Sequence, residues 1–192
     1  MKMLALAFAA FALTAAQAPV TAPAALPINP PAAIAADPAN KLTLNLSNGG
    51  TVVIQLRPDA APNHVQRVQQ LVSQGFYDGI TFHRVIAGFM AQGGDPTGTG
   101  QGGSKLPDLT AEFNTLPHLR GTVGAARTAD NPNSGNSQFY IMYVPNNSMN
   151  GEYTVFGRVI AGMDVVDSIA KGEPPAEPTK IVHASLGAAP TP

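Results

Sequence analysis

The stretch that decides the fold runs Phe82-His83-Arg84-Val85-Ile86-Ala87-Gly88-Phe89-Met90-Ala91-Gln92-Gly93-Gly94-Asp95. One arginine, Arg84, lies close in sequence to two large apolar side chains, Phe89 and Met90, and to the amide of Gln92. Alternate residues of a strand share a face, so Met90 and Gln92 are expected to point the same way. These side chains suit an uncharged ligand with an apolar ring and peptide carbonyls. They supply no nucleophile and no obvious acid–base pair.

Strand patterns dominate on both sides of this stretch. Leu42, Leu44 and Leu46 alternate with polar residues, and a turn at residues 48–50 leads into a second run over residues 51–56, which predicts a β-hairpin. Helices are expected from Pro62 to a stop at Gly75, and over residues 163–171. Further strands are expected over residues 81–84, 89–92, 122–126, 138–143, 154–159 and 180–185. Many short strands with two separated helices predict a mainly β protein, a closed barrel with helices over its ends.

The N-terminus predicts export. Lys2 precedes an apolar run over residues 3–13, and small residues follow at Ala16 and Ala18, which is typical of a signal peptide that is too short to span a membrane. Cleavage after either alanine fits the pattern. The predicted organisation is a signal peptide at residues 1–18, an Ala/Pro-rich semi-extended tether at 19–40, a folded domain at 41–187 and a flexible tail at 188–192. The expected location is the periplasm, and an uncleaved signal that tethers the protein to the membrane stays open.

Composition removes several classes of function. The 192-residue chain carries a formal net charge of -1, so nothing electrostatic favours a nucleic-acid partner. It has no cysteine, which excludes disulfides and thiolate metal sites. His64, His118 and His183 lack ligand-like spacing, so no metal and no cofactor is expected. The glycine-rich residues 98–103 lack the Lys-Ser or Lys-Thr of a phosphate loop and are interpreted as a flexible surface loop.

With these motifs, the sequence resembles the cyclophilin family of peptidyl-prolyl cis–trans isomerases. The resemblance covers almost all of residues 41–186. The motifs that carry it, in order, are Phe82-His83-Arg84, Gly88-Phe89-Met90, Gln92-Gly93-Gly94-Asp95, Glu112-Phe113-Asn114, Arg120-Gly121-Thr122-Val123-Gly124, Ser137-Gln138-Phe139 and Val155-Phe156-Gly157. The resemblance implies an eight-stranded antiparallel barrel capped by two helices, with an outer groove that binds a proline-containing peptide and needs no cofactor.

The resemblance also assigns residues by position. It implies that Arg84 is the catalytic arginine and that Gln92 helps to position Arg84 and the substrate. The residues implied to bind the substrate are Phe89, Met90, Tyr140, Met149 and Tyr153 as the proline pocket, Gln138 as a polar lining residue, and Thr128 and Ala129 as the backbone rim. Tyr140 departs from the usual phenylalanine, and its hydroxyl needs a partner or water. The other departures are Met149 for a usual leucine, Ser148 where many eukaryotic members carry tryptophan, and Ala87 for a common proline.

The implied partners are proline-containing peptides and unfolded exported proteins, bound by a monomer that isomerises X–Pro bonds. A non-catalytic proline-peptide binding module or chaperone of the same fold stays open as an alternative, because both keep the groove. A hydrolase has no support, since no G-x-S-x-G and no thiol nucleophile is present.

Overall fold

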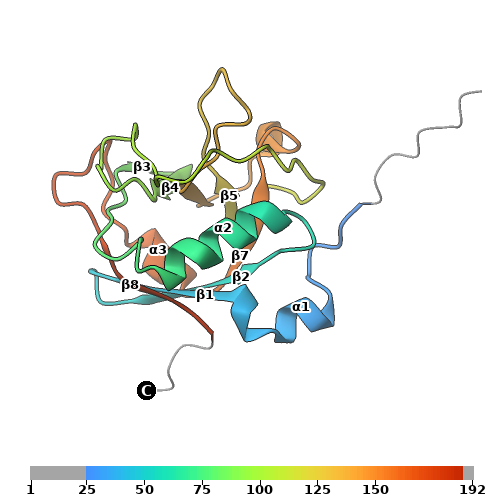
Figure 1. Cartoon of the computed structure of the whole chain (residues 1–192). Helices are drawn as coiled ribbons and strands as arrows, with labels where there is room; N and C mark the ends of the chain where they lie inside the picture. The colour runs from blue at the N-terminus through green and yellow to red at the C-terminus, as the bar shows by residue number, and fades with distance from the viewer. Residues whose placement is uncertain (1–24, 188–192) are drawn as a thin grey trace, which may run out of the picture.

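The computed structural model describes residues 25–187 (Figure 1). The predicted signal peptide, the first residues of the predicted tether and the predicted C-terminal tail lie outside this range. Within it, the elements in chain order are α1 (Ala32–Ala36), η1 (Pro38–Asn40), β1 (Lys41–Leu46), β2 (Thr51–Leu56), α2 (Pro62–Ser73), β3 (Arg84–Ile86), β4 (Met90–Gly93), β5 (Thr122–Ala125), β6 (Phe139–Met142), η2 (Asn147–Met149), β7 (Val155–Ala161), α3 (Met163–Asp167) and β8 (Ile181–Leu186). No helix in residues 25–187 is long and apolar enough to cross a bilayer.

All eight strands form one antiparallel sheet in the order β3-β4-β6-β5-β7-β2-β1-β8. The two ends of the sheet are linked by the segment before β3. Thr81 bridges Lys180, the Phe82 amide donates to the Thr179 carbonyl, and the Ile181 amide donates to the Ile80 carbonyl. The sheet is therefore strongly curled, and its ends meet through these bonds and not through a continuous ladder between β3 and β8. The predicted fold class, a mainly β protein with an eight-stranded antiparallel sheet and covering helices, is confirmed.

The predicted hairpin at residues 42–56 is confirmed in register. Leu44 pairs with Val52 and Leu42 with Ile54, so their alternate side chains share the buried face. Gly49 turns the chain at a φ of 87°, a conformation that a side chain would strain.

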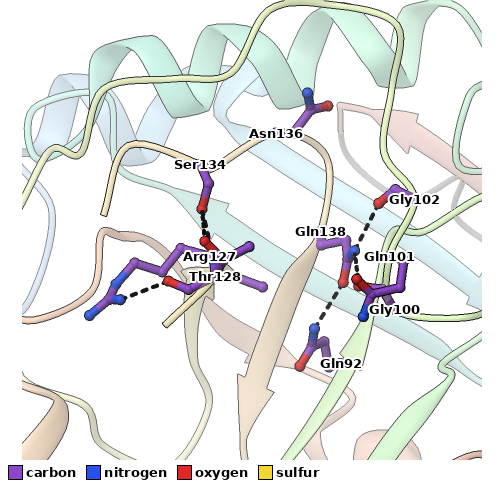
Figure 2. A pocket seen from close by; sticks show the side chains of 10 residues that line it. Gln92, Gly100, Gln101, Gly102, Arg127, Thr128, Ser134, Asn136 and Gln138 are labelled. Carbon is purple, nitrogen blue, oxygen red and sulfur yellow. Dashed lines mark hydrogen bonds between the residues drawn. The ribbon is translucent and has the colours of Figure 1, made fainter. Parts of the chain in front are cut away.

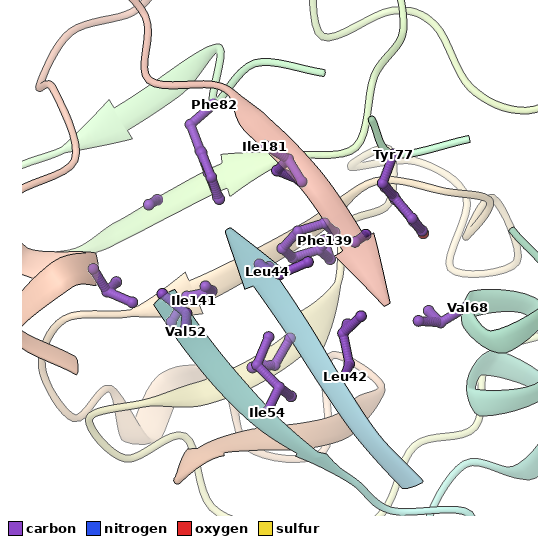
Figure 3. Close-up of a cluster of buried hydrophobic side chains, with 14 of the residues drawn as sticks. Leu42, Leu44, Val52, Ile54, Val68, Tyr77, Phe82, Phe139, Ile141 and Ile181 are labelled. Carbon is purple, nitrogen blue, oxygen red and sulfur yellow. The ribbon is translucent and has the colours of Figure 1, made fainter. Parts of the chain in front are cut away.

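The core fills the inside of the curled sheet (Figure 3). Phe82 and Phe139 meet edge to face with ring centroids 6.1 Å apart, and Tyr77 packs on Phe139 in the same manner at 5.8 Å. The Tyr77 hydroxyl is buried and donates to the Ser137 carbonyl, which satisfies its one polar atom. This packing fixes Phe139, and with it the strand that presents the next residue, Tyr140, to the opposite face.

Helix α2 covers the core from one side and packs against β7 and β8 (Figure 1). Pro62 opens it, as expected, and Gly75 ends it at a φ of 66°. Its N-cap residue makes no side-chain capping bond. Instead, Glu112 of a loop distant in sequence caps the helix, because its carboxylate accepts hydrogen bonds from the backbone amides of Asn63 and His64.

Two elements differ from their expected ranges by three or more residues at one end. The strand expected at residues 81–84 is observed as β3 at Arg84–Ile86. It starts later because the backbone of Thr81 and Phe82 pairs with Lys180 and Thr179, in the segment before β8. The helix expected at residues 163–171 ends at Asp167. Its last carbonyls are taken by the Asn48 amide and the Lys171 ammonium, so no further turn is needed to satisfy them.

The largest difference concerns the predicted tether at residues 19–40. Residues 25–40 are not a free linker: residues 32–40 contain α1 and η1, and the carbonyls of Pro27, Ile28 and Ile34 bond to side chains of the domain. The cause is Arg57, a buried guanidinium that donates to the carbonyls of Pro27 and Ile28 while its other donors bind Asp59. The Ala-rich run at residues 32–36 also has a high helix propensity, although the prolines around it favoured an extended linker in the sequence analysis.

Candidate active site

Arg84 opens β3 and faces Gln92 of β4 directly across the ladder. A tight turn at Gly88, with a φ of 70°, joins the two strands. The Arg84 side chain is 44 % exposed, so its guanidinium reaches the outer surface of the sheet and can meet a ligand.

The carboxylate of Glu173 holds this guanidinium. Arg84 Nε donates to Glu173 Oε2 at 2.8 Å. Glu173 lies in the loop between α3 and β8, 89 positions away in sequence, and no pattern in the sequence singled it out.

The amides of Gln92 and Gln138 form a chain along the groove (Figure 2). Gln92 Nε2 donates to Gln138 Oε1 at 2.9 Å, and Gln138 Nε2 donates to the carbonyls of Gly100 and Gly102. The structure therefore places Gln92 beside Arg84, as expected, but its amide N–H bonds to Gln138 instead of orienting the arginine. Each glutamine is fixed in one orientation by these bonds, and the amide chain presents a defined polar wall.

Asp95 organises the glycine-rich residues 98–103. This buried carboxylate accepts from the backbone amides of Thr97, Thr99, Gly100 and Gly102. Burial raises the pKa of Asp95, but these hydrogen bonds outweigh it and lower the pKa to about 2. The loop interpreted from sequence as flexible is thus tied down by a charged hub, and the carbonyls that hold Gln138 are fixed with it.

We expect Asp95→Asn to lower the free energy of unfolding at neutral pH by about 1–3 kcal/mol. The asparagine side chain replaces one accepting oxygen by an NH2 group, which faces backbone N–H donors and cannot accept from them. Peptide affinity should also fall, because Gln138 depends on this loop. The pKa of Asp95 is depressed in the folded state, so its stabilisation is full above the ordinary value of 3.8 and is lost as pH falls through about 2. The measurement is urea unfolding of parent and variant across pH 7 to 2. A stability gap that stays constant down to pH 2 would contradict this role, and the exposed Asp164→Asn serves as control.

The structure brings the five expected pocket residues into one apolar cluster beside β4 and β6. Met90, Tyr140 and Met149 are buried, and Phe89 and Tyr153 are partly exposed at its surface. Met142, Ile86 and Ala126 complete the cluster. Tyr140 and Tyr153 meet edge to face at 5.8 Å. A ring-sized apolar group would find contacts at the surface formed by Phe89 and Tyr153.

The hydroxyl of Tyr140 has the partner that the sequence required. His118, fully buried, places its Nε2 2.8 Å from Tyr140 Oη, and its Nδ1 lies 3.2 Å from Asn150 Oδ1. The amide oxygen can only accept, so Nδ1 carries the proton and Tyr140 donates to Nε2. Burial lowers the pKa of His118, which keeps this neutral form. Gly124 makes room, because a Cβ there would overlap the Tyr140 hydroxyl.

We expect Gly124→Ala to displace the Tyr140 ring, with a cost of about 1–3 kcal/mol in stability and a clear loss of peptide affinity. Tyr140→Phe is the matched comparison, since it removes the hydroxyl and leaves the ring in place. Calorimetric peptide titrations of both variants separate the two effects. If Gly124→Ala binds peptide as tightly as the parent, the ring position does not control the pocket.

The expected rim residues, Thr128 and Ala129, are exposed at the edge of the groove. Arg127, which sequence reasoning missed, donates to the Thr128 carbonyl (Figure 2). It also donates to the Ala129 carbonyl, and its guanidinium lies 4.5 Å from the centroid of the Tyr153 ring. One cavity of about 430 Å³ lies between Gln92, Gln138 and Arg127. A second, of about 570 Å³, is lined by Arg84, Gln92, Arg127 and Glu173. Because Gln92 and Arg127 line both, the two cavities form one groove large enough for an extended peptide.

Among residues 25–187, no group of three or more His, Asp or Glu side chains is placed to hold a metal ion. The groove offers instead a guanidinium, two oriented amides and an apolar cluster. This chemistry suits recognition of a neutral peptide segment with an apolar ring, and it defines a peptide-binding protein with an arginine beside the apolar cluster.

The family model of the "Cyclophilin type peptidyl-prolyl cis-trans isomerase/CLD" matches residues 41–186. The chain therefore belongs to the cyclophilin-type peptidyl-prolyl cis–trans isomerase family, and its reaction is the cis–trans isomerisation of X–Pro peptide bonds. The earlier resemblance is confirmed over the same residues.

Relatives agree with this assignment. The chain is 47% identical over 167 residues to a probable peptidyl-prolyl cis-trans isomerase of Brucella suis, which covers 79% of this chain and 84% of the relative. It is 39% identical over 130 residues to peptidyl-prolyl cis-trans isomerase B of Bacillus subtilis, with 67% of this chain and 89% of the relative covered.

Solved structures share the fold. A cyclophilin from Hirschia baltica is similar with a TM-score of 0.73 at 31% identity, over 81% of this chain and 77% of that chain. A Cryptosporidium parvum cyclophilin-type isomerase, crystallised in the presence of the dipeptide Ala-Pro, is similar with a TM-score of 0.71 at 28% identity, over 78% of this chain and 99% of that chain.

Proposed function

We propose that this isomerase is exported and acts on exposed X–Pro bonds of unfolded or flexible protein segments, with Arg84 as its catalytic residue. The observation that carries the proposal is the placement of the Arg84 guanidinium beside Gln92, next to the Phe89 and Met90 pocket and open to the groove. The Ala-Pro dipeptide with which the Cryptosporidium relative was crystallised supports a proline-containing ligand.

The mechanism follows from the amide bond. The barrier to rotation is ~18–20 kcal/mol because the nitrogen lone pair is conjugated with the carbonyl. Twisting breaks this conjugation, and the prolyl nitrogen becomes a better hydrogen-bond acceptor. A guanidinium N–H aimed at that nitrogen stabilises the twisted state more than either planar state, which is the differential that lowers the barrier.

One hydrogen bond is not enough. A rate gain of roughly 10⁵ requires about 7 kcal/mol, whereas one charge-assisted hydrogen bond contributes about 1.5–3 kcal/mol. The remainder comes from holding the proline ring against Phe89, Met90 and Tyr153 while the preceding carbonyl rotates. Gln92 and the rim carbonyl groups fix the flanking peptide units, so that rotation is confined to one bond.

The test uses a short X–Pro peptide in an NMR exchange or protease-coupled assay, with the purified chain and no added metal. We expect acceleration for several residues before proline. Peptide binding without acceleration, in folded protein, would favour the alternative of a proline-peptide binding module or chaperone.

The site of action is a separate part of the proposal. The signal-like residues 1–18 support a periplasmic location, where proline isomerisation limits the folding of exported chains. Cell fractionation tests it, and detection of the full-length chain only in the cytoplasm would contradict it.

A further inference from the structure

The pair between Arg84 and Glu173 is built into the fold on both sides. Gly172 and Val85 exchange two backbone hydrogen bonds, from the Val85 amide to the Gly172 carbonyl at 2.8 Å and in return at 2.9 Å. These residues are the immediate neighbours of Glu173 and Arg84. The loop is thereby clamped to β3 at the one place where its carboxylate can meet the arginine.

The same loop is braced from its other side. Gly172 adopts a φ of 145°, and a Cβ there would overlap the backbone of Pro174 and Pro175. Pro175 is buried, and Pro174 lines the same cavity as Arg84 and Glu173. The two backbone bonds at Gly172 and the buried Pro175 hold the loop on either side of Glu173, so the carboxylate is presented from an anchored base.

We propose that Glu173 is a positioning residue for the reaction, which holds Arg84 by its Nε and leaves the outer guanidinium nitrogens for the substrate. This inference rests on the proposed catalytic role of Arg84. The Nε atom bonds to Glu173 Oε2, while Nη1 and Nη2 have no protein partner within residues 25–187.

The physical reason is preorganisation. An arginine side chain has many rotamers, and a half-exposed one must be ordered before its N–H can meet the prolyl nitrogen. A bond to Nε fixes the plane of the guanidinium and so directs the outer fork into the groove. A donor oriented before the reaction needs no reorganisation when the amide twists, and the gain appears in the transition state.

Glu173 also explains why Gln92 is free to bond elsewhere. The amide N–H of Gln92 bonds to Gln138 along the groove. Orientation of the arginine and definition of the polar wall are thus divided between two side chains, one from the loop before β8 and one from β4.

The kinetic test compares Glu173→Ala, Glu173→Gln and the parent in the full chain. We expect Glu173→Ala to lower kcat/KM by about 3- to 5-fold, the upper range for an exposed ion pair, with peptide affinity changed by less than about twofold. Glu173→Gln keeps an acceptor oxygen for Nε and should recover part of the rate. Glu177→Ala is the matched control, since this exposed acid of the same loop lies outside the cavity with Arg84 and should leave the rate unchanged.

Two further measurements separate positioning from a general effect on the loop. In an Arg84→Ala background, Glu173→Ala should have no additional effect. In the parent, the NMR order parameter of the Arg84 Nε–H bond should be high and should fall in Glu173→Ala, a readout that needs no turnover. An inactive parent with an ordered Arg84 would refute the catalytic proposal alone. Unchanged order and rate in Glu173→Ala, a faster variant, or an equal loss in the Arg84→Ala background would each overturn the role of Glu173.

Discussion

Arg84→Ala is expected to lower kcat/KM by about 10- to 200-fold, the rate equivalent of about 1.5–3 kcal/mol. Peptide affinity should weaken far less, because the guanidinium bond to the prolyl nitrogen forms mainly when the amide is twisted. Arg84→Lys should also be impaired: a lysine has no Nε–H to bind Glu173 while other donors face the groove. Rates by NMR exchange and affinities by calorimetry, on variants checked by thermal melting, test both statements.

Controls lie within the same molecule. Arg158→Ala removes a partly buried arginine of β7 that lies outside both cavities of the groove, and it should keep the parent rate. Phe89→Ala should reduce affinity together with rate, since the pocket holds the ring in the ground state as well. If folded Arg84→Ala turns over at the parent rate, Arg84 is only a structural residue of the groove.

Deletion of residues 1–40 is expected to destabilise the domain by about 2–4 kcal/mol, although the sequence predicted a domain boundary there. The deletion removes the carbonyls that accept from Arg57 and the carbonyls of Ile34 and Asn40 that accept from the buried Gln55 amide. Polar groups that lose their partners carry the desolvation penalty, reduced where water reaches them.

A chain that starts at Ala25 is the matched control, because it retains every one of these contacts. Urea midpoints of the two chains give the difference directly. Equal midpoints would show that residues 25–40 rest on the domain without stabilising it.

Features that depend on residues close together in the sequence could be predicted. The hairpin of β1 and β2 was predictable since Leu42, Leu44 and Leu46 repeat at the period of a strand and the turn glycines follow at once. The apolar cluster of Phe89, Met90 and Tyr140 came from the family resemblance, and the structure gathers it in one place.

Interactions between distant segments were not predictable. Phe82 looked like part of a strand, but its backbone bonds to Thr179, almost a hundred positions away. Glu173 is one of several exposed acids in the chain, and only the Gly172–Val85 bridge brings it to Arg84. Likewise, nothing local pairs His118 with Tyr140 or docks Pro27 on Arg57, because each of these contacts needs the finished fold.

The order of the strands has a consequence for biosynthesis. β1, the first strand, lies between β2 and β8, the last strand, with Leu44 opposite Ala184. Until β8 has been made, one edge of β1 has no partner, and an open edge of a sheet invites pairing with other chains. The sheet can therefore be completed only once β8 has been made, and such long-range closure is slow. A nascent chain of this protein thus keeps an open sheet edge until β8 has been made, which is consistent with the proposed export of the chain before it folds.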